Sequence, residues 1–354
     1  MLEILPVHGI GDVRPGDDLA ELIAGAAPWL RDGDVLVVTS KIVSKAEDRL
    51  VDVPPDGPDR DAVREAAMVA ETARVVARRG ETRIVQTHHG FVMAAAGIDA
   101  SNVEPSRLVL LPKDPDASAR GLRAALRERH GLRVAVIISD TMGRTWRNGL
   151  TDVALGAAGL PPLRDHRGEV DPYGNELRLT QVAIVDELAG AGELVKGKCD
   201  QVPVAVVRGY PGVAADTPDG PGVAALVRDA SQDLFALGTA EARAAGLRDA
   251  ATLGDPEPTP GGAASVDPAA VGRAIAAVAG AVAPGTRFEQ PPDATVRPHV
   301  VAHVDAGAGP AALVRFGADL HRLRAALAAE GVASRVHPSP DPARSPTIVE
   351  LSAQ

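Results

Sequence analysis

The stretch LRVAVIISD, residues 132–140, sets the fold class of this 354-residue chain. Its apolar run from Val134 to Ile138 is unbroken and rich in β-branched side chains, which is typical of a strand buried on both faces. Polar residues, Ser139, Asp140 and Thr141, follow this run directly. They should therefore lie at a sheet edge where loops gather.

The segments around this strand alternate between strand and helix patterns. DVLVVTS, residues 34–40, reads as a second buried strand that ends in a polar loop. Apolar spacing predicts helices over 17–30, 59–79 and 116–130, strands over 82–87, 107–112 and 201–209, and a strand that passes into a helix over 179–195. This alternation predicts an α/β, or mixed α+β, domain.

A change of composition near residue 253 divides the chain. The segment GDPEPTPGGAAS concentrates Pro and Gly and has no apolar period, as expected of a linker. We therefore predict a first domain over residues 1–250, a linker over 251–264 and a small C-terminal α/β unit over 265–354. In that unit, patterns predict helices over 271–283 and 311–330 and strands over 299–304 and 347–351.

Charge and composition exclude several classes of protein. The net charge of -10 is a poor match for a nucleic-acid binder, so an anionic ligand would need a local cluster of Lys and Arg. The single cysteine, Cys199, excludes an internal disulfide and a thiolate metal cluster. Without a bilayer-length apolar run or a signal-peptide pattern, we expect a cytoplasmic protein that binds no membrane.

Polar side chains gather where the predicted strands end. The sequence has no GxxxxGK[ST], HExxH, GxSxG or CxxC motif, so the candidates are Ser40, Lys45, Asp99, Asn102, Asp140, Thr141, Arg144 and Arg147. Carboxylates can hold divalent cations and Lys or Arg can neutralise phosphate oxygens, so these residue types suit phosphoryl transfer. An Asp after a strand is more often a cap or turn residue, and exposed Lys and Arg are more often solvated surface. The adjacent His88 and His89 have no nucleophile motif beside them and stay outside the candidate site.

Five blocks of sequence, in order, resemble the coenzyme F-420:L-glutamate ligase family. They are LPVHGIGDVRPGDDLAELI, GDVLVVTSKIVSKAEDRLV, HHGFVMAAAGIDASNV, ISDTMGRTWRNGLTDVALG and ELVKGKCDQVPVAVVRG. The resemblance covers roughly residues 1–245. It implies a ligase domain of two α/β subdomains that forms a homodimer. It also implies that GTP activates the terminal carboxylate of the coenzyme precursor F-420-0, that L-glutamate attacks it, and that later rounds extend a γ-linked glutamate tail.

The resemblance assigns roles to residues of this chain. It implies contacts with GTP from Ile10, Gly11, Asp12, Val13, Ser40, Lys45 and Asn102. It implies that Asp99 and Asp140 hold one divalent cation, Mg²⁺ or Mn²⁺, and that Thr141 helps to hold a second. Asp140 and Lys45 are the expected catalytic residues, and a monovalent cation such as K⁺ is a further expected cofactor. Archaeal members have an acidic residue where this chain has Lys198, which leaves the ligands of the second metal open.

Other differences from the family concern substrate contacts and the C-terminal unit. Met142, Thr145 and His88 replace residues that are more usual in the family. Residues 314–336 resemble one helix of a flavin-binding nitroreductase-like domain, although an amphipathic helix of this kind occurs in any fold. Two alternatives stay open: a noncatalytic deazaflavin-binding homologue, and a metal-dependent ligase or kinase acting on another carboxylate.

Overall fold

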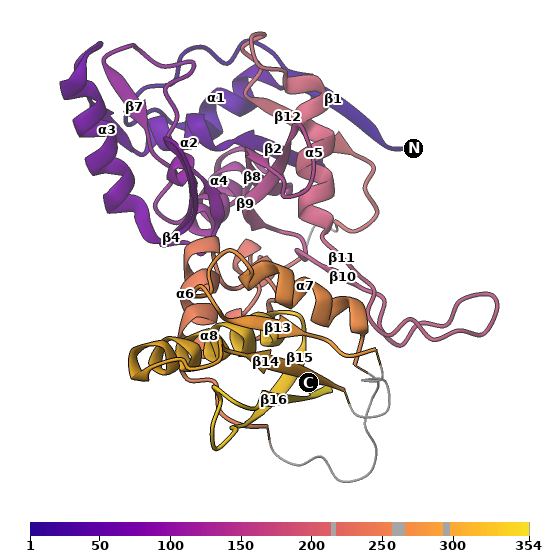
Figure 1. The fold of residues 1–354 in the computed structure, drawn as a ribbon. Coiled ribbons are helices and arrows are strands. Elements are labelled where there is room, and N and C mark those ends of the chain that lie inside the picture. Colours follow the sequence, from indigo (N-terminus) through magenta and orange to yellow (C-terminus); the bar gives the residue numbers. More distant parts are fainter. Residues whose placement is uncertain (214–216, 257–265, 293–297, 354) are drawn as a thin grey trace. The chain divides into compact units, whose positions relative to one another are not determined.

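A computed structural model describes residues 1–213, 217–256, 266–292 and 298–353 (Figure 1). The chain divides into two compact units, Met1–Glu241 and Ala242–Gln354. The predicted first domain ends nine residues later, at 250, inside the helix α6 (Thr239–Ala251). Most of the predicted linker, residues 257–264, lies outside the described residues. The mixed α/β fold class is confirmed.

A five-stranded sheet forms the centre of the first unit. Its strand order is β1 (Glu3–Val7), β12 (Val204–Arg208), β2 (Val35–Thr39), β8 (Ala135–Gly143) and β9 (Leu150–Ala158). Within this sheet β2 and β8 run parallel, and the other neighbours are antiparallel. The β2–β8 register pairs Thr39 with Ser139, where β2 ends. β8 continues to Gly143, so Asp140 and Thr141 lie within this strand, paired with β9, and not in a loop after it as the sequence suggested.

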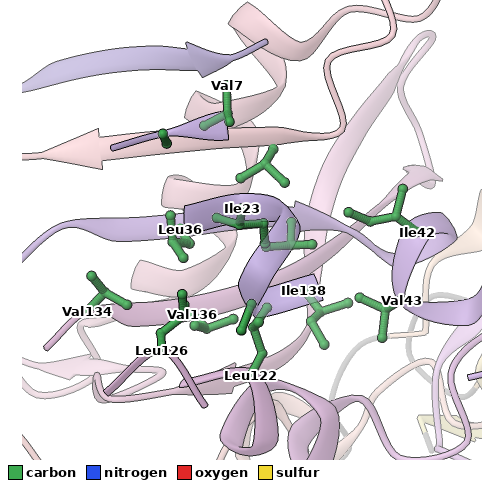
Figure 2. Close-up of a cluster of buried hydrophobic side chains, with 14 of the residues drawn as sticks. Val7, Ile23, Leu36, Ile42, Val43, Leu122, Leu126, Val134, Val136 and Ile138 are labelled. Atoms are coloured by element: carbon green, nitrogen blue, oxygen red, sulfur yellow. The ribbon is translucent and has the colours of Figure 1, made fainter. Parts of the chain in front are cut away.

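The predicted burial of β2 and β8 on both faces is confirmed. Leu36 and Val136 belong to a core cluster on one face, which helices α1 (Leu19–Ala26), α2 (Ser40–Ala46) and α4 (Pro115–His130) cover. Val37 and Ile137 belong to a cluster on the opposite face, under α5 (Ile184–Lys196). Figure 2 shows the first cluster, in which side chains from the sheet and the three helices interdigitate. This packing fixes the strand ends on which the site is built.

The segment between α2 and α4 forms smaller sheets with a core of their own. Its elements are β3 (Leu50–Asp52), α3 (Pro58–Glu71), β4 (Thr72–Arg79), β5 (Thr82–Thr87), β6 (Val92–Ala94), the 3₁₀ turn η1 (Ala95–Gly97) and β7 (Arg107–Val109). β3 pairs with β7, and β4, β5 and β6 form a three-stranded sheet. Val53, Ile98, Leu108 and Leu110 are the buried core.

The predicted helix over 59–79 is wrong beyond Glu71. Thr72–Arg79 is a strand, because Gly80 turns the chain with a φ of 59° into the β4–β5 hairpin instead of ending a helix. The β-branched residues of TARVVARR fit this pleated surface. The strand predicted ahead of α5 is reduced to β11 (Gln181–Val182), which pairs with β10 (Arg164–Asp165). The 3₁₀ turns η2 (Val223–Leu226) and η3 (Ala230–Gln232) follow later in the unit.

The second unit packs two helices on one antiparallel sheet. Its elements are α7 (Pro268–Val278), β13 (Arg287–Glu289), β14 (His299–His303), α8 (Pro310–Ala329), β15 (Val332–His337) and β16 (Thr347–Ala353), with strand order β13-β14-β16-β15. Val271, Leu323 and Val349 lie in its core, where α7 and α8 meet the sheet. The helices and strands predicted here occur, and β13 and β15 were not predicted. Among the described residues, no helix has the length and apolarity that a bilayer crossing needs.

Candidate active site

A cavity of about 990 Å³ lies where β2 and β8 end. We call it the strand-exit cavity. Its walls include the loop after β1, the start of α2, the residues after η1, the end of β8 and the segment after α5. It brings together nine of the ten predicted site residues: Ile10, Gly11, Asp12, Val13, Lys45, Asp99, Asn102, Asp140 and Thr141.

The remaining candidates lie elsewhere. Ser40 is only 4% exposed at the first position of α2, and its neighbours Thr39 and Lys41 line the cavity in its place. Arg144 and Arg147, which the strand-exit pattern also suggested, are exposed in the β8–β9 loop outside the lining. Of the two histidines, His88 is exposed and neither lines the cavity.

The loop after β1 is held at both ends by apolar side chains. Ile10 and Val13 are 5% and 3% exposed and belong to the main core cluster. Gly11 and Asp12, between them, are exposed and line the cavity. Burial of Ile10 and Val13 therefore holds the backbone of Gly11 and Asp12 against the cavity. This loop has no GxxxxGK[ST] sequence.

Two lysines on one face of α2 point into the same cavity. Lys41 and Lys45 are four residues apart, which places them on one side of the helix. Lys45 Nζ lies 2.7 Å from Asp12 Oδ1, and Lys41 Nζ lies 2.6 Å from Asp99 Oδ2. Lys41 was not among the predicted residues, although its spacing from Lys45 was a usable signal.

Asp99 and Asn102 lie in the turn that follows η1. Asp99 is bridged to Val109, and it accepts hydrogen bonds from the backbone N–H and hydroxyl of Ser101. Burial alone would raise the pKa of Asp99, but the hydrogen bonds from Lys41 and Ser101 hold it below the ordinary value. Asn102 adopts a φ of 52°, a left-handed conformation that Asn tolerates, and donates to the Lys198 carbonyl at 3.3 Å.

Asp140 carries a strongly perturbed carboxyl group. The pKa of Asp140 is raised to about 6, mainly by burial, and the charges of Asp152 and Asp99 act in the same direction while a hydrogen bond from the Thr141 N–H opposes them. Carboxylates that repel one another in a cavity are a site that a cation would stabilise. Asp99 and Asp140 thus offer oxygen ligands of the kind that Mg²⁺ and Mn²⁺ bind.

A buried network lies behind Asp140 and fixes its neighbour Thr141. The β8–β9 register places Thr141 directly opposite Asp152, and the Thr141 hydroxyl donates to Asp152 Oδ1 at 2.7 Å. Ser139 and Lys196 both donate to Asp152 Oδ2, at 2.9 Å and 2.8 Å. Burial would raise the pKa of Asp152, but Lys196 and these hydrogen bonds hold it below its ordinary value. Asp152 was not predicted because β9 was not, although the turn pair Asn148–Gly149 is typical of a hairpin. Lys196, at the end of α5, was not predicted either.

Lys198 lies beside Thr141, the residue predicted to help hold a second metal ion. Lys198 Nζ lies 2.5 Å from Thr141 Oγ1 and 2.5 Å from Glu193 Oε1. Across the described part of the chain, no group of three or more His, Cys, Asp or Glu side chains is arranged to hold a metal. Asp99 and Asp140 could hold one divalent cation, whose other ligands would come from solvent or substrate, whereas the Thr141 hydroxyl is already hydrogen-bonded to Asp152 and Lys198.

The fold and the cavity define an α/β protein with a pocket lined by several lysines and carboxylates. The model of the F420-0:gamma-glutamyl ligase family matches residues 9–209, the part of the chain that contains every predicted site residue. The chain belongs to this family.

Curated relatives match about two thirds of the chain over nearly their whole length. The coenzyme F420:L-glutamate ligase of Methanopyrus kandleri is 44% identical over 247 residues, 66% of this chain and 97% of that protein. The protein of the same name from Methanothermobacter thermautotrophicus is 40% identical over 250 residues, 66% of this chain and 98% of its own length. That from Haloarcula marismortui is 41% identical over 250 residues, again 66% of this chain and 95% of that protein. The second compact unit lies outside the segment that the family model matches.

Proposed function

We propose that this chain joins L-glutamate to the coenzyme precursor F-420-0, with GTP as the activating cosubstrate. The observation that carries the proposal is the strand-exit cavity, in which Lys41, Lys45, Asp99 and Asp140 lie together in a chain of the F420-0:gamma-glutamyl ligase family. The names of the curated relatives support the glutamate ligation, and the cavity supports a substrate that carries several negative charges.

The proposed reaction has two steps, activation of the carboxylate as an acyl phosphate and formation of the amide. A carboxylate oxygen of the precursor attacks the γ-phosphorus of GTP, forming a C–O–P bond and releasing GDP. The glutamate amino nitrogen then attacks the acyl carbon, losing a proton, and phosphate leaves with the bond electrons. Each amide bond therefore consumes one GTP and releases one GDP and one phosphate. Repetition at the side-chain carboxylate of the added glutamate would give a γ-linked tail.

The residues divide the tasks of this reaction. The backbone of the loop Ile10–Val13 and the ammonium groups of Lys45 and Lys41 face the space in which a triphosphate would lie. Asp99 and Asp140 would hold one divalent cation, which supplies positive charge where two anions must approach each other. Lys45 can leave Asp12 for a phosphate oxygen, because the Asp12 side chain is 71% exposed and water can solvate its carboxylate when the contact breaks. The homodimer, the choice between Mg²⁺ and Mn²⁺, and a K⁺ requirement stay predictions.

Isotope transfer tests the acyl-phosphate step directly. With precursor labelled by ¹⁸O in the reacting carboxylate, each released phosphate is expected to carry one ¹⁸O atom, because the carboxylate oxygen stays on phosphorus when the amide forms. The phosphate is analysed by mass spectrometry and compared with the amount of amide product. Phosphate without the label, released in step with the amide, would rule out this intermediate.

A further inference from the structure

The ammonium group of Lys198 stands where a second cation was expected. Its two short contacts, with the Thr141 hydroxyl and the Glu193 carboxylate, are both to oxygen atoms of the type that hard metal cations take as ligands. Lys198 lines the strand-exit cavity and its side chain is 61% exposed, so the charged end is open to a ligand that enters.

The buried network orients Thr141 for this contact. The Thr141 hydroxyl gives its proton to Asp152, so the oxygen can only accept toward Lys198. Asp152 cannot turn away, because Ser139 and the buried Lys196 hold its other oxygen. The fixed Thr141 oxygen is therefore a preformed acceptor for a positive charge.

Glu193, on helix α5, is the second residue that contacts the Lys198 ammonium group. Its Oε1 atom lies 2.5 Å from Lys198 Nζ, and its Oε2 atom lies 3.4 Å from Lys196 Nζ. Both oxygens of the carboxylate thus face ammonium groups, which leaves little negative charge to attract a divalent cation. An ammonium group has three N–H donors, and the contacts with Thr141 and Glu193 use two of them. The third is available to an oxygen anion in the cavity.

We propose that Lys198 replaces the second metal ion of the reaction, so that each site of this chain binds one divalent cation, on Asp99 and Asp140, and uses the Lys198 ammonium as its second positive charge. The group that Lys198 would contact is an anionic oxygen of the nucleotide phosphate or of the reacting carboxylate. This assignment rests on the proposed function, because only a polyanionic substrate needs the second charge.

Counting bound Mn²⁺ tests the proposal. The full chain is titrated with Mn²⁺ by electron paramagnetic resonance, with and without GDP, as wild type, as Lys198→Glu and as Lys113→Glu. Lys113→Glu is the matched control, because Lys113 is exposed outside the cavity lining and undergoes the same change of charge. Lys198→Glu places a carboxylate beside Glu193 and Thr141, so it is expected to bind one more Mn²⁺ per chain than wild type, whereas Lys113→Glu binds the same number as wild type.

The outcomes separate this inference from the proposed function. Two Mn²⁺ ions per wild-type chain, or equal counts in wild type and Lys198→Glu, would overturn the inference while leaving the ligase proposal in place. The numbers of Mn²⁺ ions bound without GDP test the role of Lys198 even if the nucleotide does not bind. Failure of wild type to bind GDP at any Mn²⁺ concentration would count against GTP as cosubstrate. Thermal melting of each variant verifies that the fold is kept.

Discussion

Replacing Asp140 with asparagine is expected to lower the ligation rate roughly a thousandfold without unfolding the protein, a loss of about 4 kcal/mol of transition-state stabilisation. Asp140 and Asp99 are the carboxylates that would hold the divalent cation, so Asp140→Asn leaves a single charged ligand. Turnover is measured at saturating GTP and metal. Asp186→Asn is the control, because burial also raises the pKa of Asp186, yet its carboxylate accepts from the Ala154 N–H outside the cavity. Wild-type activity in Asp140→Asn would contradict the metal assignment.

The same substitution has a signature in stability. The folded chain raises the pKa of Asp140 from 3.8 to about 6, so it binds this proton more tightly than the unfolded chain does. Between about pH 4 and pH 6 the folded state therefore loses stability through this group as pH rises, by up to about 3 kcal/mol. Asp140→Asn removes this loss. In denaturant unfolding without metal, the stability gain of the variant over wild type should grow from pH 4 to pH 6 and then level off, and a gain that shrinks over this range would contradict the raised pKa.

The second large effect is expected from Lys196→Met, which should lower the free energy of unfolding by about 3–5 kcal/mol and the melting temperature by about 10 °C. Lys196 and Asp152 are 3% and 2% exposed, so the variant leaves the Asp152 charge buried without its cation. Adding Asp152→Asn to Lys196→Met should recover part of the loss, because it removes the unpaired charge, and the double-mutant cycle measures this coupling.

An exposed ion pair provides the control for this cycle. Arg167 and Asp165 are 52% and 43% exposed, and Arg167→Ala should change the unfolding free energy by less than about 1 kcal/mol. Additive effects of the Lys196 and Asp152 substitutions would show that the two side chains do not act as a pair. Because Asp152 holds the Thr141 hydroxyl, the single variants should also bind nucleotide more weakly than wild type at temperatures where they are folded.

An element of the fold could be predicted when its own sequence carries a clear pattern of buried residues. The apolar runs in β2 and β8 were sufficient, because a strand covered on both faces needs apolar residues at every position. Helices α4 and α8 were also predicted close to their bounds. Thr72–Arg79 was misread as helix, because its alanine and arginine residues fit either structure and the hairpin at Gly80 decides between them. β9 was missed because its small residues, which pack against α4, have little hydrophobic signal.

Some residues of the candidate site could be predicted from local sequence, and others are brought together only by the fold. Asp140 ends the apolar run of β8, Asp99 follows η1 and Lys45 lies in the helix after β2. All three belong to blocks that resemble the family, so the sequence indicated them. Asp152 and Lys196 are linked only by the pairing of β8 with β9 and the packing of α5, which no local pattern reports. Ser40 illustrates the reverse case, since its block matched but its side chain is buried away from the cavity lining.

Mass spectrometry of the coenzyme precursor tests the central claim most directly. F-420-0 is incubated with the protein, GTP, a divalent cation and L-glutamate, with Asp140→Asn as the inactive control and GDP followed in parallel. The proposal predicts product masses that increase by whole glutamyl residues, with one GDP for each residue added. Nucleotide binding without any increase in mass would contradict it and favour a noncatalytic deazaflavin-binding protein, and GDP release with an unchanged precursor would favour a ligase or kinase for another carboxylate.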